Sequence, residues 1–122
     1  MRFMTIVKGP ENTGPIPSGL IEGIMKLGEE AGKAGVMVEM GGLMPSAASS
    51  RVRLRNGKIA ITDGPFTEAK EVFGGFAVYD VKSKEEAVEW ARRFMELHAK
   101  HWPGWEGEVE VRPFMEGPPP QA

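Results

Sequence analysis

Cysteine is absent from this chain of 122 residues, and histidine occurs only twice. The absence of cysteine excludes a disulfide framework and any zinc site that is built on thiolates. No apolar run approaches the ~18 residues that a membrane-spanning helix needs. The first residues also lack the long apolar core of a signal peptide, so we expect a cytoplasmic protein with no membrane partner.

The chain also lacks an excess of basic charge, since 15 lysines and arginines stand against 17 acidic residues, for a net charge of −2. Proteins that bind nucleic acid usually carry a clear basic excess, so we do not expect a nucleic-acid partner. The sequence contains no phosphate loop, dinucleotide fingerprint, nucleophile elbow or zinc signature. It therefore predicts neither a cofactor nor a metal, and its length fits a single domain.

The apolar patterns that are present predict a split β-α-β unit repeated twice. Strands are expected over 2–8, 36–40, 76–81 and 107–112, and helices after Ser18 and Ser83. This order is the ferredoxin-like α+β plan, in which two helices cover one face of a four-stranded sheet. The other face would stay open and apolar, so we expect two copies to join sheet to sheet as a homodimer. A small-molecule ligand would then enter a cleft between the sheet and its loops.

The first helix carries an apolar face, but it also contains three internal glycines, Gly23, Gly28 and Gly32. Each glycine weakens a helix by roughly 1 kcal/mol relative to alanine. Either these glycines let a sheet or a helix approach closely, or they simply make a poor helix, and the pattern leaves both readings open. Ser18 is the expected N-cap, and Gly35 is the expected left-handed residue at the C-terminal end.

An inserted β-hairpin is predicted over 51–62, because Asn56-Gly57 is the favoured two-residue hairpin turn. The turn pairs Val52 with Ile61, Leu54 with Ile59 and Arg55 with Lys58. In this register the apolar side chains share one face, and the arginines at 51, 53 and 55 form a basic row on the other. Such a row is typical of a solvated strand surface that discourages edge pairing.

The most polar connection of the chain is the stretch 62–76, which we interpret as the wall of a pocket. Asp63 opens the turn Asp63-Gly64-Pro65-Phe66, where it either accepts backbone N–H groups or acts as a general acid or base. Phe73 is expected in the core. Gly74-Gly75 are expected at a β-bulge or at a close backbone contact.

The segments Asp63-Gly64-Pro65-Phe66, Thr67-Glu68-Ala69-Lys70-Glu71 and Gly74-Gly75-Phe76 resemble the signature of the DGPF family of YCII-related proteins. The resemblance extends over 1–115 and leaves 116–122 as a proline-rich tail. It implies a ferredoxin-like fold that dimerises as an α+β barrel. Some YCII proteins carry a histidine–aspartate pair for acid–base work, with the histidine early in the chain. The first histidine here is His98, so that pair cannot be carried over.

Two functions stay open, and the sequence does not decide whether the protein is an enzyme. The first is binding of a small polar or anionic molecule, with the lyase- or isomerase-type chemistry that the wider YCII group implies. Its candidate residues are Asp63 and His101 for catalysis and Phe66, Glu68, Lys70, Glu71 and Arg112 for ligand binding. The second is a non-catalytic dimeric module, because DGPF domains resemble proteins found beside or fused to sigma factors. In that case the charged candidates are solvated, Phe66 is a core residue, and His101 is a helix-end group.

Overall fold

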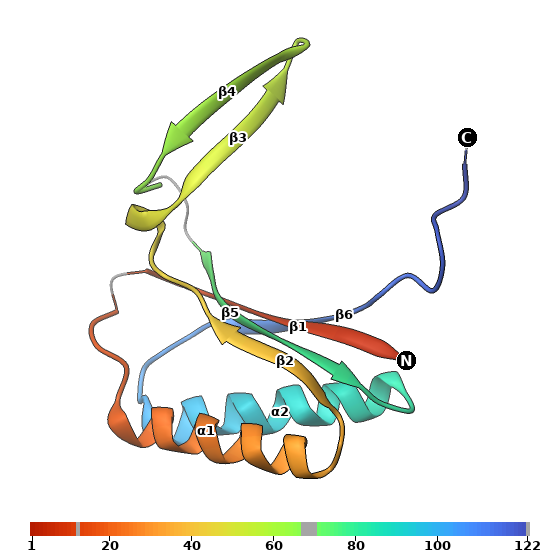
Figure 1. The fold of residues 1–122 in the computed structure, drawn as a ribbon. Coiled ribbons are helices and arrows are strands. Elements are labelled where there is room, and N and C mark those ends of the chain that lie inside the picture. The colour runs from red at the N-terminus through yellow and green to blue at the C-terminus, as the bar shows by residue number, and fades with distance from the viewer. Residues whose placement is uncertain (12, 67–70, 122) are drawn as a thin grey trace.

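A computed structural model describes residues 1–11, 13–66 and 71–121 of the chain (Figure 1). The elements are β1 (Arg2–Gly9), α1 (Ser18–Lys33), β2 (Met37–Gly42), the short 3-10 helix η1 (Ser46–Ala48), β3 (Ser50–Arg55), β4 (Lys58–Asp63), β5 (Val72–Asp80), α2 (Lys84–His101) and β6 (Glu108–Pro113). Neither α1 nor α2 has the length and apolar character that crossing a membrane requires.

Four strands form one antiparallel sheet in the order β2-β5-β1-β6, and β3 and β4 form a separate two-stranded sheet. This order is that of a ferredoxin-like fold with a hairpin inserted between β2 and β5, as the sequence predicts. The strand β1 is central, since it pairs with both β5 and β6. The dimer and the barrel that the resemblance implies stay predictions.

Both helices lie side by side against one face of the sheet, and the core lies between the two layers (Figure 1). The buried core cluster consists of Phe3, Ala31, Tyr79, Val81 and Ala87. Alternate residues of a strand point to opposite faces, so Thr5 joins Phe3 on the helical side, while Met4 and Ile6 lie on the uncovered side. The sheet therefore has one packed face and one face without a covering layer in the described part of the chain.

The helix ends confirm the predicted left-handed residue Gly35 but not the predicted N-cap Ser18. Gly35 has φ +75°, and Ser83 caps α2 by accepting a hydrogen bond from the N–H of Glu86 at 3.2 Å. The carboxylate of Glu86 reaches back to accept from the N–H of Lys82, and not from that of Ser83 as in a full capping box. The prediction that Ser18 is an N-cap is wrong. The extended backbone of Pro17 takes that place, and its carbonyl accepts the first helical hydrogen bonds.

At two of the three glycines of α1, the missing side chain lets a neighbouring element pack closely, and at the third it does not. A Cβ at Gly23 would lie 2.8 Å from Leu97 of α2, and a Cβ at Gly28 would lie 2.9 Å from the sulfur of Met40 on β2. At Gly32 nothing lies within 4 Å. Both readings of the sequence therefore apply, each to different glycines.

Strand β5 begins at Val72, four residues earlier than the sequence predicts, because pairing with β1 continues past the twin glycines. The register shifts opposite Gly74, and a Cβ at Gly75 would lie 2.9 Å from the carbonyl oxygen of Gly41. The predicted bulge and close backbone contact are thus both confirmed. The prediction that Phe73 belongs to the core is wrong, since this residue is 58% exposed on the lengthened strand.

The hairpin of β3 and β4 has the predicted register, with Val52 opposite Ile61 and Leu54 opposite Ile59. Its turn residues Asn56 and Gly57 both have positive φ, at 51° and 73°. Figure 1 shows the hairpin projecting away from the sheet on the side opposite the helices. Local turn chemistry alone therefore determines its register, because it does not pack into the core.

A polar contact at Ser46 fixes the base of this hairpin. The backbone N–H and the hydroxyl of Ser46 both donate to the carboxylate of Glu11, the hydroxyl at 2.7 Å. The same hydroxyl accepts from the N–H of Phe66 at 3.2 Å, and the N–H of Gly64 donates to Ser49 at 2.8 Å. A Cβ at Gly64 would collide with the carbonyl oxygen of Ser46. The turn after β4 therefore needs glycine at this position.

The substitution Gly64→Ala should lower the free energy of unfolding, by about 1–3 kcal/mol, because its methyl group has to displace backbone at Ser46. Urea unfolding followed by circular dichroism measures this change. The matched control is Gly74→Ala, whose Cβ meets nothing within 4 Å. A variant Gly64→Ala as stable as the control would show that this contact does not hold the hairpin base.

Candidate functional site

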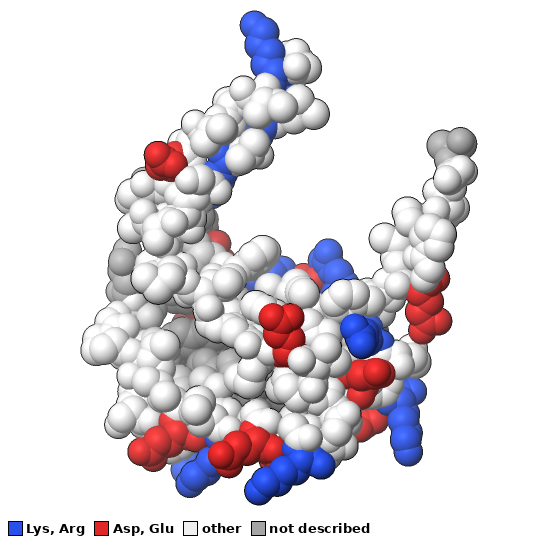
Figure 2. Space-filling model, viewed as in Figure 1, with Lys and Arg blue, Asp and Glu red and all other residues white. Residues whose placement is uncertain are grey.

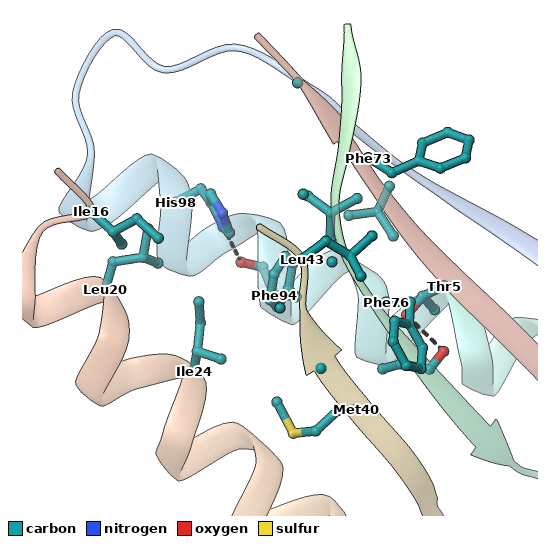
Figure 3. A pocket seen from close by; sticks show the side chains of 18 of the residues that line it. Thr5, Ile16, Leu20, Ile24, Met40, Leu43, Phe73, Phe76, Phe94 and His98 are labelled. Carbon is teal, nitrogen blue, oxygen red and sulfur yellow. Dashed lines mark hydrogen bonds between the residues drawn. The ribbon is translucent and has the colours of Figure 1, made fainter. Parts of the chain in front are cut away.

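A cavity of about 560 Å³ lies between the sheet and the two helices. Figure 3 shows how Leu20 and Ile24 reach it from α1, Met40 and Leu43 from β2 and the residues after it, and His98 from α2. Ligand pockets in proteins typically measure about 300–1,000 Å³, so this volume suits a small molecule. The cavity lies on the packed side of the sheet, and residues of the loops after β1 and β2 also line it.

The walls of the cavity are mostly apolar because they consist of the core-facing stripes of α1 and the sheet. Five ionisable or hydroxyl side chains of the described residues also line it: Thr5, Glu11, Thr13, Tyr79 and His98. The described lining includes no lysine and no arginine. An anionic ligand would therefore meet no cationic side chain from these residues.

Three of these five side chains make contacts within the protein. The hydroxyl of Thr5 donates to the carbonyl oxygen of Ala77 at 3.3 Å, and Glu11 accepts from Ser46. The ring of Tyr79 stacks on Trp90, with a centroid separation of 5.9 Å, and burial raises its pKa. These groups shape the cavity while holding its walls together.

His98 differs from them, because one of its ring nitrogens is left for a ligand. The side chain is only 6% exposed, and its Nδ1 lies 3.0 Å from the carbonyl oxygen of Phe94 (Figure 3). A carbonyl oxygen can only accept, so Nδ1 carries the proton, and in the neutral ring Nε2 keeps its lone pair. Burial lowers the pKa of His98, and this effect outweighs the increase that the hydrogen bond to Phe94 causes. At neutral pH this residue is therefore an uncharged hydrogen-bond acceptor.

Aromatic rings surround this histidine. Its ring lies 4.7 Å from that of Phe94 and 4.6 Å from that of Trp105, centroid to centroid. The chain reverses after α2 at Gly104, whose φ is +86°, and the N–H of Trp105 donates to the carbonyl of Trp102 at 3.1 Å. The two indole rings stack at 6.1 Å. This turn places a wall of planar side chains at the end of the cavity beside His98.

The turn that the sequence singled out lies at the hairpin base, outside the cavity. Asp63 is exposed, and its carboxylate accepts a hydrogen bond from the hydroxyl of Ser50 at 2.6 Å. The ring of Phe66 lies under the guanidinium of Arg51, 3.8 Å from its centroid. Neither Asp63 nor Phe66 lines the cavity. Their proposed roles in catalysis and binding stay predictions.

The other candidates that the structure describes are also apart from the cavity. Glu71 is exposed, and Arg112 is exposed and paired with Glu110. His101 lies beside the start of α1, where a Cβ at Gly19 would meet its Nδ1 at 2.8 Å. Glu68 and Lys70 fall outside the described residues. The structure thus does not bring the five described candidates together in one site.

Sequence reasoning missed His98 and Trp105, although a signal for the histidine was present. His98 follows Ala87, Ala91 and Phe94 on the apolar face of its helix, and a titratable side chain on such a face is unusual. Trp105 had no such signal, because its contact with the histidine depends on the turn at Gly104. Over the described residues, no group of three or more acidic or histidine side chains could hold a metal ion.

The order of the strands and the layered packing define a ferredoxin-like α+β protein with an apolar cavity between its layers. The chain belongs to the YCII-related domain family, whose profile matches residues 1–115. It is also similar to the uncharacterized protein R00369 of Rhizobium meliloti (strain 1021), with 36% identity over 85 residues. That alignment covers 70% of this chain and 62% of the relative, so the chain spans less than two thirds of the relative's length.

The buried ring of His98 should make stability depend on pH in one direction. Burial lowers its pKa below the ordinary 6.5, so on acidification the unfolded chain takes up a proton before the native chain does. The free energy of unfolding should therefore fall as the pH drops below about 6.5, and it should keep falling until the lowered pKa is reached. Urea unfolding between about pH 7 and about pH 5 tests this, and His98→Gln should reduce the fall.

Glu11 provides a control, because its carboxylate acts in another pH range. Hydrogen bonds from Ser46 lower the pKa of Glu11 below the ordinary 4.5, so its contribution is lost only at more acid pH. The variant Glu11→Gln should keep the wild-type fall between about pH 7 and about pH 5. An equal fall in the wild type and in His98→Gln would contradict the assignment to the histidine.

Proposed function

We propose that this protein binds a small, ring-bearing and mostly apolar molecule that carries one hydrogen-bond donor, in the cavity between the sheet and the helices. The observation that carries this proposal is the uncharged His98, whose Nε2 is an acceptor in a mostly apolar cavity. Leaving an acceptor in such surroundings without a partner costs free energy, so a donor on the ligand would be strongly favoured there. The aromatic rings of Phe94 and Trp105 would pack against a planar ligand.

The same histidine supplies a route to acid–base chemistry without a cofactor. A ligand O–H or acidic C–H bond directed at Nε2 would transfer its proton to His98, and the electron pair of that bond would stay on the ligand. The imidazolium formed would still donate from Nδ1 to Phe94, and the face of Trp105 would stabilise its charge. A step of this kind begins an elimination or an isomerisation. It assigns to His98 the proton transfer that the sequence assigned to Asp63 and His101.

A non-catalytic module is the second candidate, and the hairpin base favours it. Asp63 is exposed and hydrogen-bonded to Ser50, and Arg112 pairs with Glu110, so neither addresses the cavity. An arrangement of exposed, paired charges is the one expected of a module that acts through its surface. An association with a sigma factor stays a prediction that comes from the resemblance alone.

Phenol and toluene form a matched pair of probes, because they share a ring and only phenol carries a hydroxyl donor. The wild-type protein should bind phenol roughly 3–10-fold more tightly than toluene, as expected for one buried hydrogen bond. The substitution His98→Phe should keep the ring but remove the acceptor, and the preference should fall to about 1. NMR titrations that follow the indole N–H signals of Trp102 and Trp105 measure both affinities.

Two variants on α1 locate the binding site. Ile24 lines the cavity, so Ile24→Trp should fill it and weaken binding of both probes. Met25 is 66% exposed and does not line the cavity, so Met25→Trp should bind both probes like the wild type. Equal affinity for phenol and toluene in the wild type, or no binding of either, would refute the proposal.

A further inference from the structure

One charged side chain reaches the cavity from the loop after β1, namely the carboxylate of Glu11. The rest of the described lining is uncharged at neutral pH, because it includes no lysine, arginine or second carboxylate and burial keeps His98 neutral. The oxygens of Glu11 accept from the N–H and the hydroxyl of Ser46, and these hydrogen bonds lower the pKa of Glu11. Glu11 is therefore ionised at neutral pH and gives a mostly apolar cavity a negative charge.

This negative charge has no counter-charge in the described part of the chain. Ser46 supplies neutral donors, and no described lysine or arginine is among the groups that shift the pKa of Glu11. A carboxylate offers about four acceptor positions, and the two hydrogen bonds from Ser46 leave the others open. Glu11 can thus accept hydrogen bonds from a ligand while it still holds Ser46. Figure 2 shows that acidic side chains are otherwise distributed over the outer surface of the body, where water solvates them.

Glu11 lies at the end of the cavity that also holds the aromatic wall. The loop after β1, the segment after β2 and the end of α2 all lie at one end of the fold (Figure 1). A Cβ at Gly9 would lie 2.8 Å from the ring of Trp105, whose own ring contacts that of His98. Glu11 follows Gly9 by two residues, a span of about 7 Å at most. The carboxylate, the indole and the imidazole therefore belong to the same part of the cavity.

We infer that the ligand of this cavity is an aromatic amine, whose protonated amino group pairs with Glu11 while its ring packs among the aromatic side chains. This inference rests on the proposed function, and it adds a positive charge to the ring-bearing ligand described there. An ammonium group carries hydrogen-bond donors only, which suits the open acceptor positions of a carboxylate. Hydrogen bonds between two charged groups are also roughly twice as strong as those between neutral groups.

The aromatic rings of the cavity also favour a cation. The face of such a ring carries partial negative charge and attracts a cation that lies within about 6 Å of its centre. The phenylalanine and tryptophan residues of the lining are Phe73, Phe76, Phe94, Trp102 and Trp105. An anion would instead be repelled by Glu11, and no described cationic side chain of the lining would offset this repulsion. Charge therefore discriminates among ring-bearing ligands of equal size.

Benzylamine and benzyl alcohol separate the effect of charge from that of shape, because a protonated amino group in the first replaces a hydroxyl group in the second. At pH 7 the wild type should bind benzylamine roughly 10-fold more tightly than benzyl alcohol, and it should bind benzoate more weakly than either. The substitution Glu11→Gln should reduce the preference for benzylamine to about 1, while the affinity for benzyl alcohol stays within about threefold of the wild type. NMR titrations of the indole N–H signals measure these affinities.

Two further variants separate the charge of Glu11 from its structural contact. Glu29 is exposed on α1 and does not line the cavity, so Glu29→Gln removes the same charge from the chain and should keep the preference for benzylamine. Ser46→Ala removes one hydrogen bond to Glu11 but leaves its carboxylate in place, so this variant should keep the preference as well. If Glu11→Gln weakens the binding of both probes alike, the carboxylate only supports the cavity, and the inference is wrong.

The roles of Glu11 and His98 can fail separately. His98→Phe should lose the preference for phenol over toluene and keep that for benzylamine over benzyl alcohol, and Glu11→Gln should do the reverse. Equal affinity of the wild type for benzylamine and benzyl alcohol, or tighter binding of benzoate, would overturn the inference even if the preference for phenol holds. Binding of none of these probes would refute the proposed function together with the inference.

Discussion

One buried hydroxyl, that of Ser46, connects three segments that are far apart in the chain. It donates to Glu11 in the connection before α1, and it accepts from the backbone of Phe66 after the hairpin. The first contact holds a segment that borders the cavity, and the second holds the hairpin base. The charged and glycine-containing turn beside it therefore has a structural explanation: Gly64 is required because any side chain would occupy the place of Ser46. The contacts of Ser46 therefore help to fix the position of the hairpin base beside the cavity.

The elements of the fold could be predicted from the sequence because they depend on local chemistry. The Asn56-Gly57 turn fixes the hairpin register, and alternation together with the capping residue Ser83 defines strands and α2. Where the prediction failed, a contact with a distant segment or a neighbouring residue decided the outcome. Strand β5 is longer because β1 continues to pair with it, and Pro17 displaces Ser18 from the N-cap.

The candidate site was harder to predict, because charge density in a sequence does not show which way a side chain points. The turn at Asp63 is rich in polar residues, yet Asp63 and Phe66 support the hairpin and do not line the cavity. His98 carries a weaker signal, because it appears as one polar residue on an apolar helix. Its importance emerges only when the fold brings Trp105 and Phe94 onto its ring and leaves Nε2 without a partner among the described residues.

The hairpin enters the chain between β2 and β5, so it interrupts no pairing within the four-stranded sheet. Its length and sequence can consequently diverge without disturbing the strand order or the helical layer. The cavity, by contrast, is built from the residues that hold the sheet and helices together, where each substitution also affects folding. Natural variation in such a chain is thus freer to alter the hairpin than to alter what the interior accommodates.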